Sequence, residues 1–315
     1  MLKSNGNFYL SFDFEKFWGV SDLGVDSPYI NSNIKNVDSV FPSILEFLDE
    51  YGVAATFATV GLLFSNRNDI SEFKNYNIPY INSKLNPFIN LDKILKLEDR
   101  IIFGGNALDM LLKNKKHEIA SHTFSHFYCL EKNVTISDFE NDLINFKNIT
   151  NQYETKTLIF PRNQYNPKFI PILKKYGFKF LRVNNESSFI YKTRVNSPFF
   201  IRLLRLIDRY FSISKISVSK IVEKDGVLLQ NDSRFFAPYI RKLSFLEPFK
   251  VNRIKKEMTF CAKNNLDYHL WTHPHNFGAN TKEMLEQFNI LLKHYKYLNN
   301  LYGFKSKKMN EISIF

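Results

Sequence analysis

The stretch VDSVFPSILEFLDEYGVAATFATVG, residues 37–61, decides the fold class. Residues 37–52 carry apolar side chains at helical spacing and end in a glycine, which predicts a helix closed by Gly52. Residues 53–61 are apolar and predict a strand that also ends in glycine. The earlier run NFYLSFDF, residues 7–14, predicts another strand. Two strands joined by a helix form a parallel βαβ unit, so the sequence predicts an α/β fold.

Strand and helix patterns keep alternating along the chain. The expected elements are helices at 106–115 and 135–153, a strand at 157–163, and a helix, turn and strand over 166–183. No internal repeat and no linker rich in Pro, Gly or Ser divides the chain, so we expect a single domain over residues 1–315. Less typical insertions are expected near 62–100 and 184–225.

Composition narrows the class of protein. The 315 residues are 44% hydrophobic, enough for a substantial core. Two cysteines exclude a disulfide-rich scaffold and a cysteine-only zinc site. The start of the chain lacks the features of a secretory signal, and no window approaches 18 charge-free apolar residues. We therefore expect a cytoplasmic protein.

The net charge of +12 suits nucleic-acid binding, but the basic residues are scattered. The runs KNKKH at 113–117, RIKKE at 253–257 and KSKK at 305–308 are typical of solvated surface. We expect no nucleic-acid partner, and the sequence leaves the oligomeric state open.

A histidine pair is the first candidate for chemistry. His122 and His126 stand four apart in HTFSH, so both imidazoles can share one face of a helical turn or point inward from a tight loop. Neutral imidazole is a common ligand of zinc-like metals, and small polar neighbours such as Ser121 and Ser125 could orient it. A metal site needs a third ligand.

Two acids are candidates for that third ligand. Asp13 and Glu15 lie two apart at the end of an apolar strand, so they share a face, while Phe12 and Phe14 point the other way. Two carboxylates this close repel each other and lose hydration, and a divalent cation would relieve that cost. The alternative is that both acids cap the next segment at the surface.

These residues resemble the polysaccharide deacetylases of carbohydrate esterase family four, in the branch whose first motif is D-x-D. SFDFE resembles that first motif, with Glu15 in place of the second Asp, and HTFSH fits the second motif, H-[ST]-x-x-H. GVAATFATVG and KKHEIASHTFSH resemble the sequences around these motifs in the family. The resemblance covers residues 11–180 and, more loosely, 226–278.

Two further motifs match in part. IFPRNQY, residues 159–165, keeps Pro161 of the family's third motif but has Ile159 where the family has Arg, with Arg162 after the proline. Either Arg162 takes the role of the family's arginine from a different position, or that role is absent. HLWTHPHNFG, residues 269–278, resembles the motif that provides a general acid. His273 stands in the expected place, and His275 is the alternative. We expect four residues to contact the substrate, namely Pro161, Arg162, Trp271 and His275.

The resemblance implies an incomplete or distorted (β/α) barrel with its site at the carboxyl ends of the strands. It also implies a hydrolase that removes an N-acetyl or similar acyl group from an amino sugar of a cell-envelope polysaccharide or its precursor. Glu15, His122 and His126 would hold a divalent metal ion, expected to be zinc. Asp13 would accept a proton from the attacking water, and His273 would protonate the leaving amine.

Residues 197–220 lie outside the resemblance and are amphipathic and basic, with arginines and lysines among Phe, Leu and Ile. Such a helix either lies on an anionic membrane surface or packs on the barrel. The first alternative would place the protein at the inner membrane as a peripheral protein.

Two other functions stay open. One is a carbohydrate-binding protein on a catalytically degenerate scaffold, which the exchange at Glu15 and the missing third-motif arginine favour. The other is a deformylase of a lipid-linked amino sugar, because the same chemistry removes formyl groups.

Overall fold

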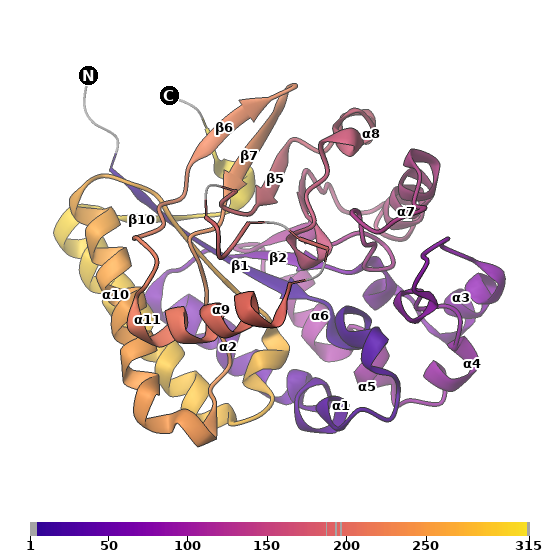
Figure 1. The fold of residues 1–315 in the computed structure, drawn as a ribbon, viewed down its shortest axis with the longest axis horizontal. Helices are drawn as coiled ribbons and strands as arrows, with labels where there is room; N and C mark the ends of the chain where they lie inside the picture. Colours follow the sequence, from indigo (N-terminus) through magenta and orange to yellow (C-terminus); the bar gives the residue numbers. More distant parts are fainter. Residues whose placement is uncertain (1–4, 187, 193, 196, 314–315) are drawn as a thin grey trace.

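A computed structural model describes residues 5–186, 188–192, 194–195 and 197–313. They form a ten-stranded sheet in the order β6-β7-β5-β4-β3-β2-β1-β9-β8, with β10 paired to β1. The strands are β1 Asn7–Phe14, β2 Thr56–Thr59, β3 Glu118–Ser121, β4 Thr157–Ile159, β5 Phe180–Val183, β6 Ile221–Lys224, β7 Val227–Asn231, β8 Arg234–Phe235, β9 Tyr268–Thr272 and β10 Lys305–Lys307. Figure 1 shows β1 and β2 near the centre of the molecule.

The sheet is curled into a half-barrel, the distorted (β/α) barrel that the sequence predicts. The pairs from β1 through β5 and from β1 to β9 are parallel, whereas β6 and β7 form an antiparallel hairpin. Met309 packs with Ala58, Ala120 and Ile159. Because Asp13 pairs in register with Ala58, its side chain shares a face with this cluster.

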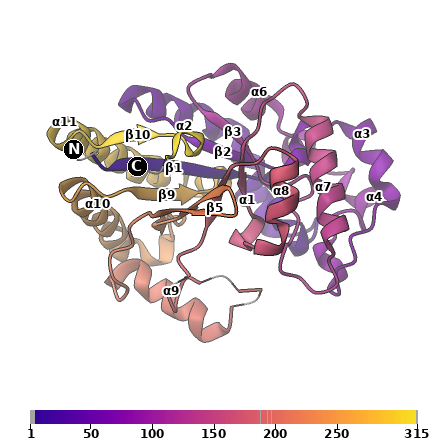
Figure 2. The same ribbon diagram turned by 90° about the horizontal axis from the view of Figure 1, so that it is seen from above.

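Longer helices cover the outside of the sheet (Figures 1 and 2). The α-helices are α1 Pro28–Ser32, α2 Val37–Tyr51, α3 Arg67–Ser71, α4 Leu91–Ile94, α5 Asp99–Ile102, α6 Gly105–Lys113, α7 Ile136–Ile149, α8 Ile170–Lys175, α9 Phe199–Phe211, α10 Glu247–Lys263 and α11 Thr281–Tyr302. α2 ends as its sequence predicts, because Gly52 takes the left-handed conformation with φ of 65°.

Short 3-10 helices make many of the turns. They are η1 Lys16–Leu23, η2 Ile34–Asn36, η3 Gly61–Phe64, η4 Glu72–Asn75, η5 Ser83–Leu85, η6 Pro161–Asn163, η7 Pro167–Phe169, η8 Arg241–Leu246, η9 Pro274–Phe277 and η10 Met309–Glu311. In the region 62–100, where we expect an insertion, they alternate with α3 and α4, whose Ile70 and Leu91 are buried in the core.

The amphipathic segment forms a shorter helix than the sequence suggests. α9 ends at Phe211, where Ser212 is left-handed with φ of 52°. Asp208 accepts hydrogen bonds from the backbone N–H and the hydroxyl of Ser214, which turns the chain back. Figure 2 shows α9 set apart from the central strands, beside α10. No helix in the described part of the chain is both long and apolar enough to cross a bilayer.

A buried ionic network fixes α9 to α10 and β8. The carboxylate of Asp208 lies 3.1 Å from the Arg253 guanidinium and 3.3 Å from that of Arg234. Glu257 pairs with both arginines, at 3.2 and 2.5 Å. The RIKKE run therefore does not lie wholly on a solvated face, because its first and last residues are buried.

Removing one member of this network should destabilise the fold. Replacing Arg253 by Met leaves Asp208 without one of its two buried cations, and we expect a loss of about 3 to 5 kcal/mol in the free energy of unfolding. The matched control Lys256→Met changes an exposed residue of α10 and should stay within about 0.5 kcal/mol. Urea unfolding compares the two variants, and equal stability would contradict a structural role for the network.

Candidate metal and catalytic site

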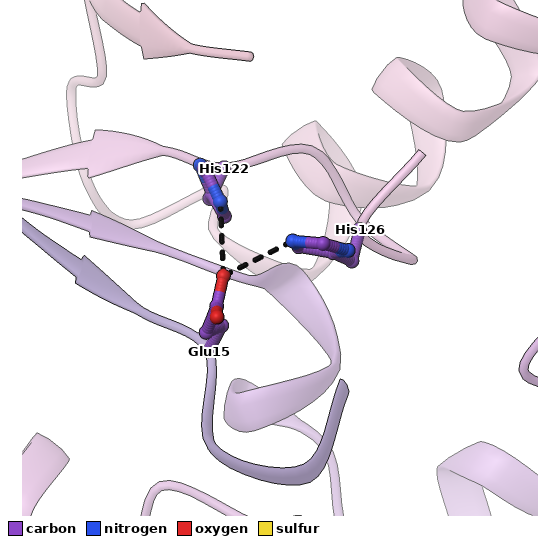
Figure 3. A group of neighbouring side chains, drawn as sticks. All are labelled: Glu15, His122 and His126. Carbon is purple, nitrogen blue, oxygen red and sulfur yellow. Dashed lines mark ion pairs between the residues drawn. The ribbon is translucent and has the colours of Figure 1, made fainter. Parts of the chain in front are cut away.

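The candidate residues gather at one end of the barrel. Asp13 lies near the end of β1, and Glu15 follows that strand. His122 follows β3, and His273 follows β9. The carboxyl ends of parallel strands meet at one edge, where barrel enzymes carry their functional groups. Figure 3 shows how Glu15, His122 and His126 point toward one another.

Lys16 fixes the turn that follows β1. Its buried ammonium group donates to the Asp38 carboxylate at 2.7 Å and to the carbonyl oxygens of Phe103 and Gly104 at 2.7 and 3.1 Å. Burial lowers the pKa of Lys16, and the Asp38 charge opposes that effect. The Trp18 indole N–H donates to the Ile102 carbonyl oxygen at 2.6 Å. These contacts fix the turn that carries Glu15.

Gly19 leaves room for the Glu15 side chain. A Cβ atom at position 19 would lie 2.0 Å from Cδ of Glu15 and 2.1 Å from its Oε1. Any larger residue therefore has to displace the carboxylate. The glycine in SFDFEKFWG is explained by this close approach rather than by a left-handed backbone.

The HTFSH segment is a tight loop, one of the two conformations that its spacing allows. Thr123 and His126 are both left-handed, with φ of 64° and 61°. The buried Asp142 of α7 accepts the backbone N–H groups of Phe124 and Ser125 at 2.7 and 3.1 Å. Burial raises the pKa of Asp142 to about 6, against the effect of these hydrogen bonds.

His122 is oriented by its other ring nitrogen. Nδ1 lies 2.8 Å from the carbonyl oxygen of Ile159, so the proton is assigned to Nδ1 and the lone pair to Nε2. Nε2 is buried and makes no hydrogen bond to any residue that the structure describes. A buried nitrogen that makes no hydrogen bond and is aimed at a carboxylate and a second histidine is typical of a metal ligand.

The three side chains in Figure 3 fit a divalent metal ion. Oε2 of Glu15 lies 3.3 Å from Nε2 of His122 and 3.0 Å from Nε2 of His126. Bonds of about 2.0 to 2.1 Å in tetrahedral zinc geometry separate ligand atoms by roughly 3.3 Å. All three ligand atoms lie within 4.8 Å of one another.

A second group shares the same glutamate. Glu15, His273 and His275 also bring one ligand atom each within 4.8 Å. Oε1 of Glu15 lies 3.5 Å from Nε2 of His273, and the two imidazole rings stack with centroids 4.7 Å apart. The closer distances to His122 and His126 favour the first group as the metal ligands.

Asp13 is paired with an arginine that the motifs did not indicate. The Arg182 guanidinium of β5 donates to both carboxylate oxygens of Asp13, at 2.8 and 2.7 Å. It also donates to Asn163 and to the hydroxyl of Ser11, and it lies over the Trp271 ring. Burial raises the pKa of Asp13, but the charge and hydrogen bonds of Arg182, together with the charges of His122 and His273, outweigh that effect and the pKa is lowered. Asp13 therefore stays ionised while buried.

Glu15 also stays charged. Burial raises its pKa, while the charges of His273 and His126 and the close contacts with His122 and His126 lower it well below the usual value. Two carboxylates separated by one residue are thus neutralised by different groups.

The two C-terminal histidines differ in access. His273 keeps 18% of its side chain exposed, and its Nε2 lies 3.9 Å from Oδ2 of Asp13. His275 is buried, and its Nδ1 has no hydrogen-bond partner among the described residues. Burial, followed by the charge of His273, lowers the pKa of His275 to about 3. His275 is therefore neutral near pH 7 and is a poor proton donor.

The expected substrate contacts lie in different places. Trp271, Arg162 and His275 line a cavity of about 1500 Å³ together with Asp13 and Glu15. Arg162 pairs with Asp22 at 2.8 Å and lies over the Tyr128 ring, so it does not reach Asp13. Pro161 is buried and is not among the residues that line this cavity.

Comparisons with known proteins agree with this arrangement. The family model described as polysaccharide deacetylase matches residues 25–181. The chain belongs to the polysaccharide deacetylase family, whose activity as carbohydrate esterases supports a hydrolase. Asp13, Glu15 and His273 lie outside the matched residues. No curated protein matches the sequence.

Solved structures show the same fold. A protein from Mycobacterium smegmatis assigned to the polysaccharide deacetylases is 11% identical with a TM-score of 0.53, and the match covers 99% of this chain and 96% of that one. A GH57 branching enzyme from Thermococcus kodakaraensis is 11% identical with a TM-score of 0.52, covering 100% and 72%. A 4-alpha-glucanotransferase from Thermococcus litoralis is 12% identical with a TM-score of 0.50, covering 98% and 40%.

The close approach of Gly19 to Glu15 gives a test of the metal ligands. In Gly19→Ala the new methyl group displaces the Glu15 carboxylate, so we expect the affinity for a divalent metal ion such as Zn²⁺ to fall by about 10- to 100-fold. The control Ser21→Ala changes the same 3-10 helix and should keep its affinity. Competitive titration against a chelating dye measures both. Unchanged affinity in Gly19→Ala would contradict Glu15 as a ligand.

Proposed function

We propose that the protein is a metal-dependent hydrolase that removes an N-acetyl or similar acyl group from an amino sugar of a surface polysaccharide or its precursor. The observation that carries this proposal is that Glu15, His122 and His126 come together at the wall of a cavity that is also lined by Asp13 and His273. We further propose that residues 1–315 act as one domain in the cytoplasm.

Each of these side chains has a part in the proposed reaction. Glu15, His122 and His126 hold the divalent cation, for which zinc is proposed. A bound cation of this kind supplies Lewis-acid chemistry, because it polarises an acyl carbonyl and makes water a better nucleophile near pH 7.

Asp13 accepts the proton of the water whose oxygen forms a bond to the acyl carbon. Arg182 uses one acceptor position on each Asp13 oxygen, which leaves further lone pairs free for that proton. His273 then donates a proton to the amine nitrogen as the C–N bond breaks, giving a carboxylic acid and a free amino sugar. The partly exposed His273 suits this role better than the buried His275.

Arg182 is proposed to position Asp13. Arg182 lies outside the third motif. It provides the positive charge that is missing from that motif, where Ile159 replaces the family's arginine. Its five donors are spent on Asp13, Ser11 and Asn163, and its planar face lies 4.5 Å from the centre of the Trp271 ring. This favours an active site over a degenerate one.

Two substitutions separate proton transfer from metal binding. Asp13→Asn should lower acetate release by about 10²- to 10⁴-fold while the protein keeps its metal, because the amide cannot accept the proton. His126→Ala should lose the metal itself. The control His294→Ala changes a histidine of α11 outside the cavity and should alter neither.

Acetate and formate release from a panel of N-acylated sugars, with metal added and chelated, distinguishes the possible functions. Acetate release supports the deacetylase, and formate release supports the deformylase of a lipid-linked amino sugar. Tight glycan binding without release of either acid would identify a carbohydrate-binding protein. A fully active Asp13→Asn variant would overturn the role given to Asp13.

We also propose that α9 lies on an anionic membrane surface. Phe199, Phe200 and Phe211 are 79%, 61% and 59% exposed, although α9 packs on α10 through its buried face. Basic side chains beside exposed aromatic ones are typical of helices that lie in a lipid interface.

Vesicle co-sedimentation tests this association. The protein should bind vesicles that contain phosphatidylglycerol and release them as salt rises, and Phe199→Ser with Phe200→Ser should weaken binding at least about tenfold. The control pair Tyr297→Ser and Leu301→Ser removes exposed apolar side chains from α11. Binding that does not depend on anionic lipid would contradict the proposal.

A further inference from the structure

The catalytic cavity extends well beyond the candidate metal ligands. Its volume of about 1500 Å³ exceeds the roughly 300 to 1000 Å³ of common small-molecule sites. One end holds Asp13 and Glu15, and Phe199, Arg202 and Leu203 of α9 line another part of the wall. A substrate that reaches both parts is larger than one acylated sugar.

The part of the cavity lined by Lys192, Arg194 and residues 197–215 is strongly basic. We call it the basic arm, and its cations are Lys192, Arg194, Arg202, Arg205, Arg209 and Lys215. In the part of the chain that the structure describes, none of these six forms an ion pair with a carboxylate. Asp13, Glu15 and Asp232 are the carboxylates among the lining residues, and Asp13 is already paired with Arg182.

Two arginines of the basic arm share one acceptor. Arg205 donates to the carbonyl oxygen of Ile190 at 3.0 Å, and Arg194 donates to the same oxygen at 3.5 Å. Two guanidinium groups at one neutral oxygen repel each other, and burial followed by the Arg194 charge lowers the pKa of Arg205. An anion between them would relieve this repulsion.

The acid of α9 cannot supply that anion. Asp208 is fully buried on the side of α9 that faces α10, and it is used by Arg234, Arg253 and the hydroxyl of Tyr191. The carboxylate of α9 therefore anchors the helix to its neighbours, while the arginines of α9 line the cavity.

We propose that the basic arm binds the phosphate of an acylated sugar joined to the rest of its molecule through a phosphate ester. This inference rests on the proposed function, because it names the substrate class of the same site. A phosphate ester offers more charge and more acceptor oxygens than one carboxylate, and arginine forks match its geometry. The acyl group then lies at the end of the cavity that holds Glu15.

The exposed aromatic residues beside the basic arm indicate where the phosphate comes from. Phe199 lines the cavity and is 79% exposed, and its neighbour Phe200 is 61% exposed. A lipid chain on the far side of the phosphate would meet these rings. A soluble sugar phosphate would not need them.

Binding measured in the Asp13→Asn background tests the basic arm without turnover. Three probes carry N-acetylglucosamine: its methyl glycoside, its 1-phosphate, and its ester with a short polyprenyl phosphate. The fourth probe is an N-acetylated amino uronic acid. Calorimetry should show the 1-phosphate binding at least about tenfold tighter than the methyl glycoside, the effect of one charge-assisted hydrogen bond.

The variants remove charge from the basic arm. Arg202→Gln with Arg205→Gln should abolish the preference for the phosphate and leave methyl glycoside binding unchanged. Arg202→Gln with Lys215→Gln gives a second test that keeps the Arg205 contact with Ile190. The control Lys282→Gln with Lys296→Gln removes two exposed charges from α11, outside the cavity, and should change nothing.

Each outcome has a defined meaning. Equal binding of the neutral and phosphorylated sugars, or equal preference for the uronic acid, overturns the phosphate site even if acetate is released. Absence of acyl release from every probe by the unaltered protein counts against the proposed function, while binding to the basic arm is still measured. Tighter binding of the polyprenyl form, lost in Phe199→Ser with Phe200→Ser, identifies the lipid source, and equal binding identifies a soluble sugar phosphate.

Discussion

Two ionised carboxylates at the buried end of one strand are the constraint on which the site depends. Asp13 and Glu15 are 3% and 5% exposed, and neither could keep its charge there without a positive partner. Arg182 from β5 neutralises Asp13, while His122 and His126 from the loop after β3 face Glu15. The barrel must curl for groups so far apart in sequence to meet, so the charges and the curvature of the sheet depend on each other.

The sequence correctly predicts the helices and strands whose formation depends on local periodicity. The strand at 7–14, the helix closed by Gly52 and the helix begun by Thr135 all form, because each depends on neighbouring residues only. The alternation of β1 also holds, since Phe12 and Phe14 stack on Phe57 and Phe41 while Asp13 points the other way. In the candidate site, the spacing of HTFSH predicts that the two histidines lie together, but it does not choose between helix and loop. That choice is made by the buried Asp142, eighteen residues beyond Phe124.

Arg182 shows why motif reading stops short. The third motif directs attention to Arg162, which follows the expected proline, yet Arg162 pairs with Asp22. The residue that pairs with Asp13 stands two strands from β3 in the sheet, in a run that reads only as an apolar strand. The only indication of this residue in the sequence is a single arginine within an apolar run. That arginine becomes informative once its burial is known, because a fully buried guanidinium requires an anion, which Asp13 supplies.

The same reasoning separates the arginines of the chain into two kinds. Arg182, Arg234 and Arg253 are buried and each has a carboxylate from the protein, so their positions are satisfied without any ligand. Arg202 and Arg205 line the cavity and have no carboxylate partner among the residues that the structure describes. The net charge of +12 alone would give no reason to distinguish them. Elsewhere in the protein, buried arginines are paired with carboxylates. The acid of α9, Asp208, instead lies on the side of that helix that faces away from the cavity arginines. The unpaired arginines are therefore a property of the cavity rather than of an overall excess of basic residues.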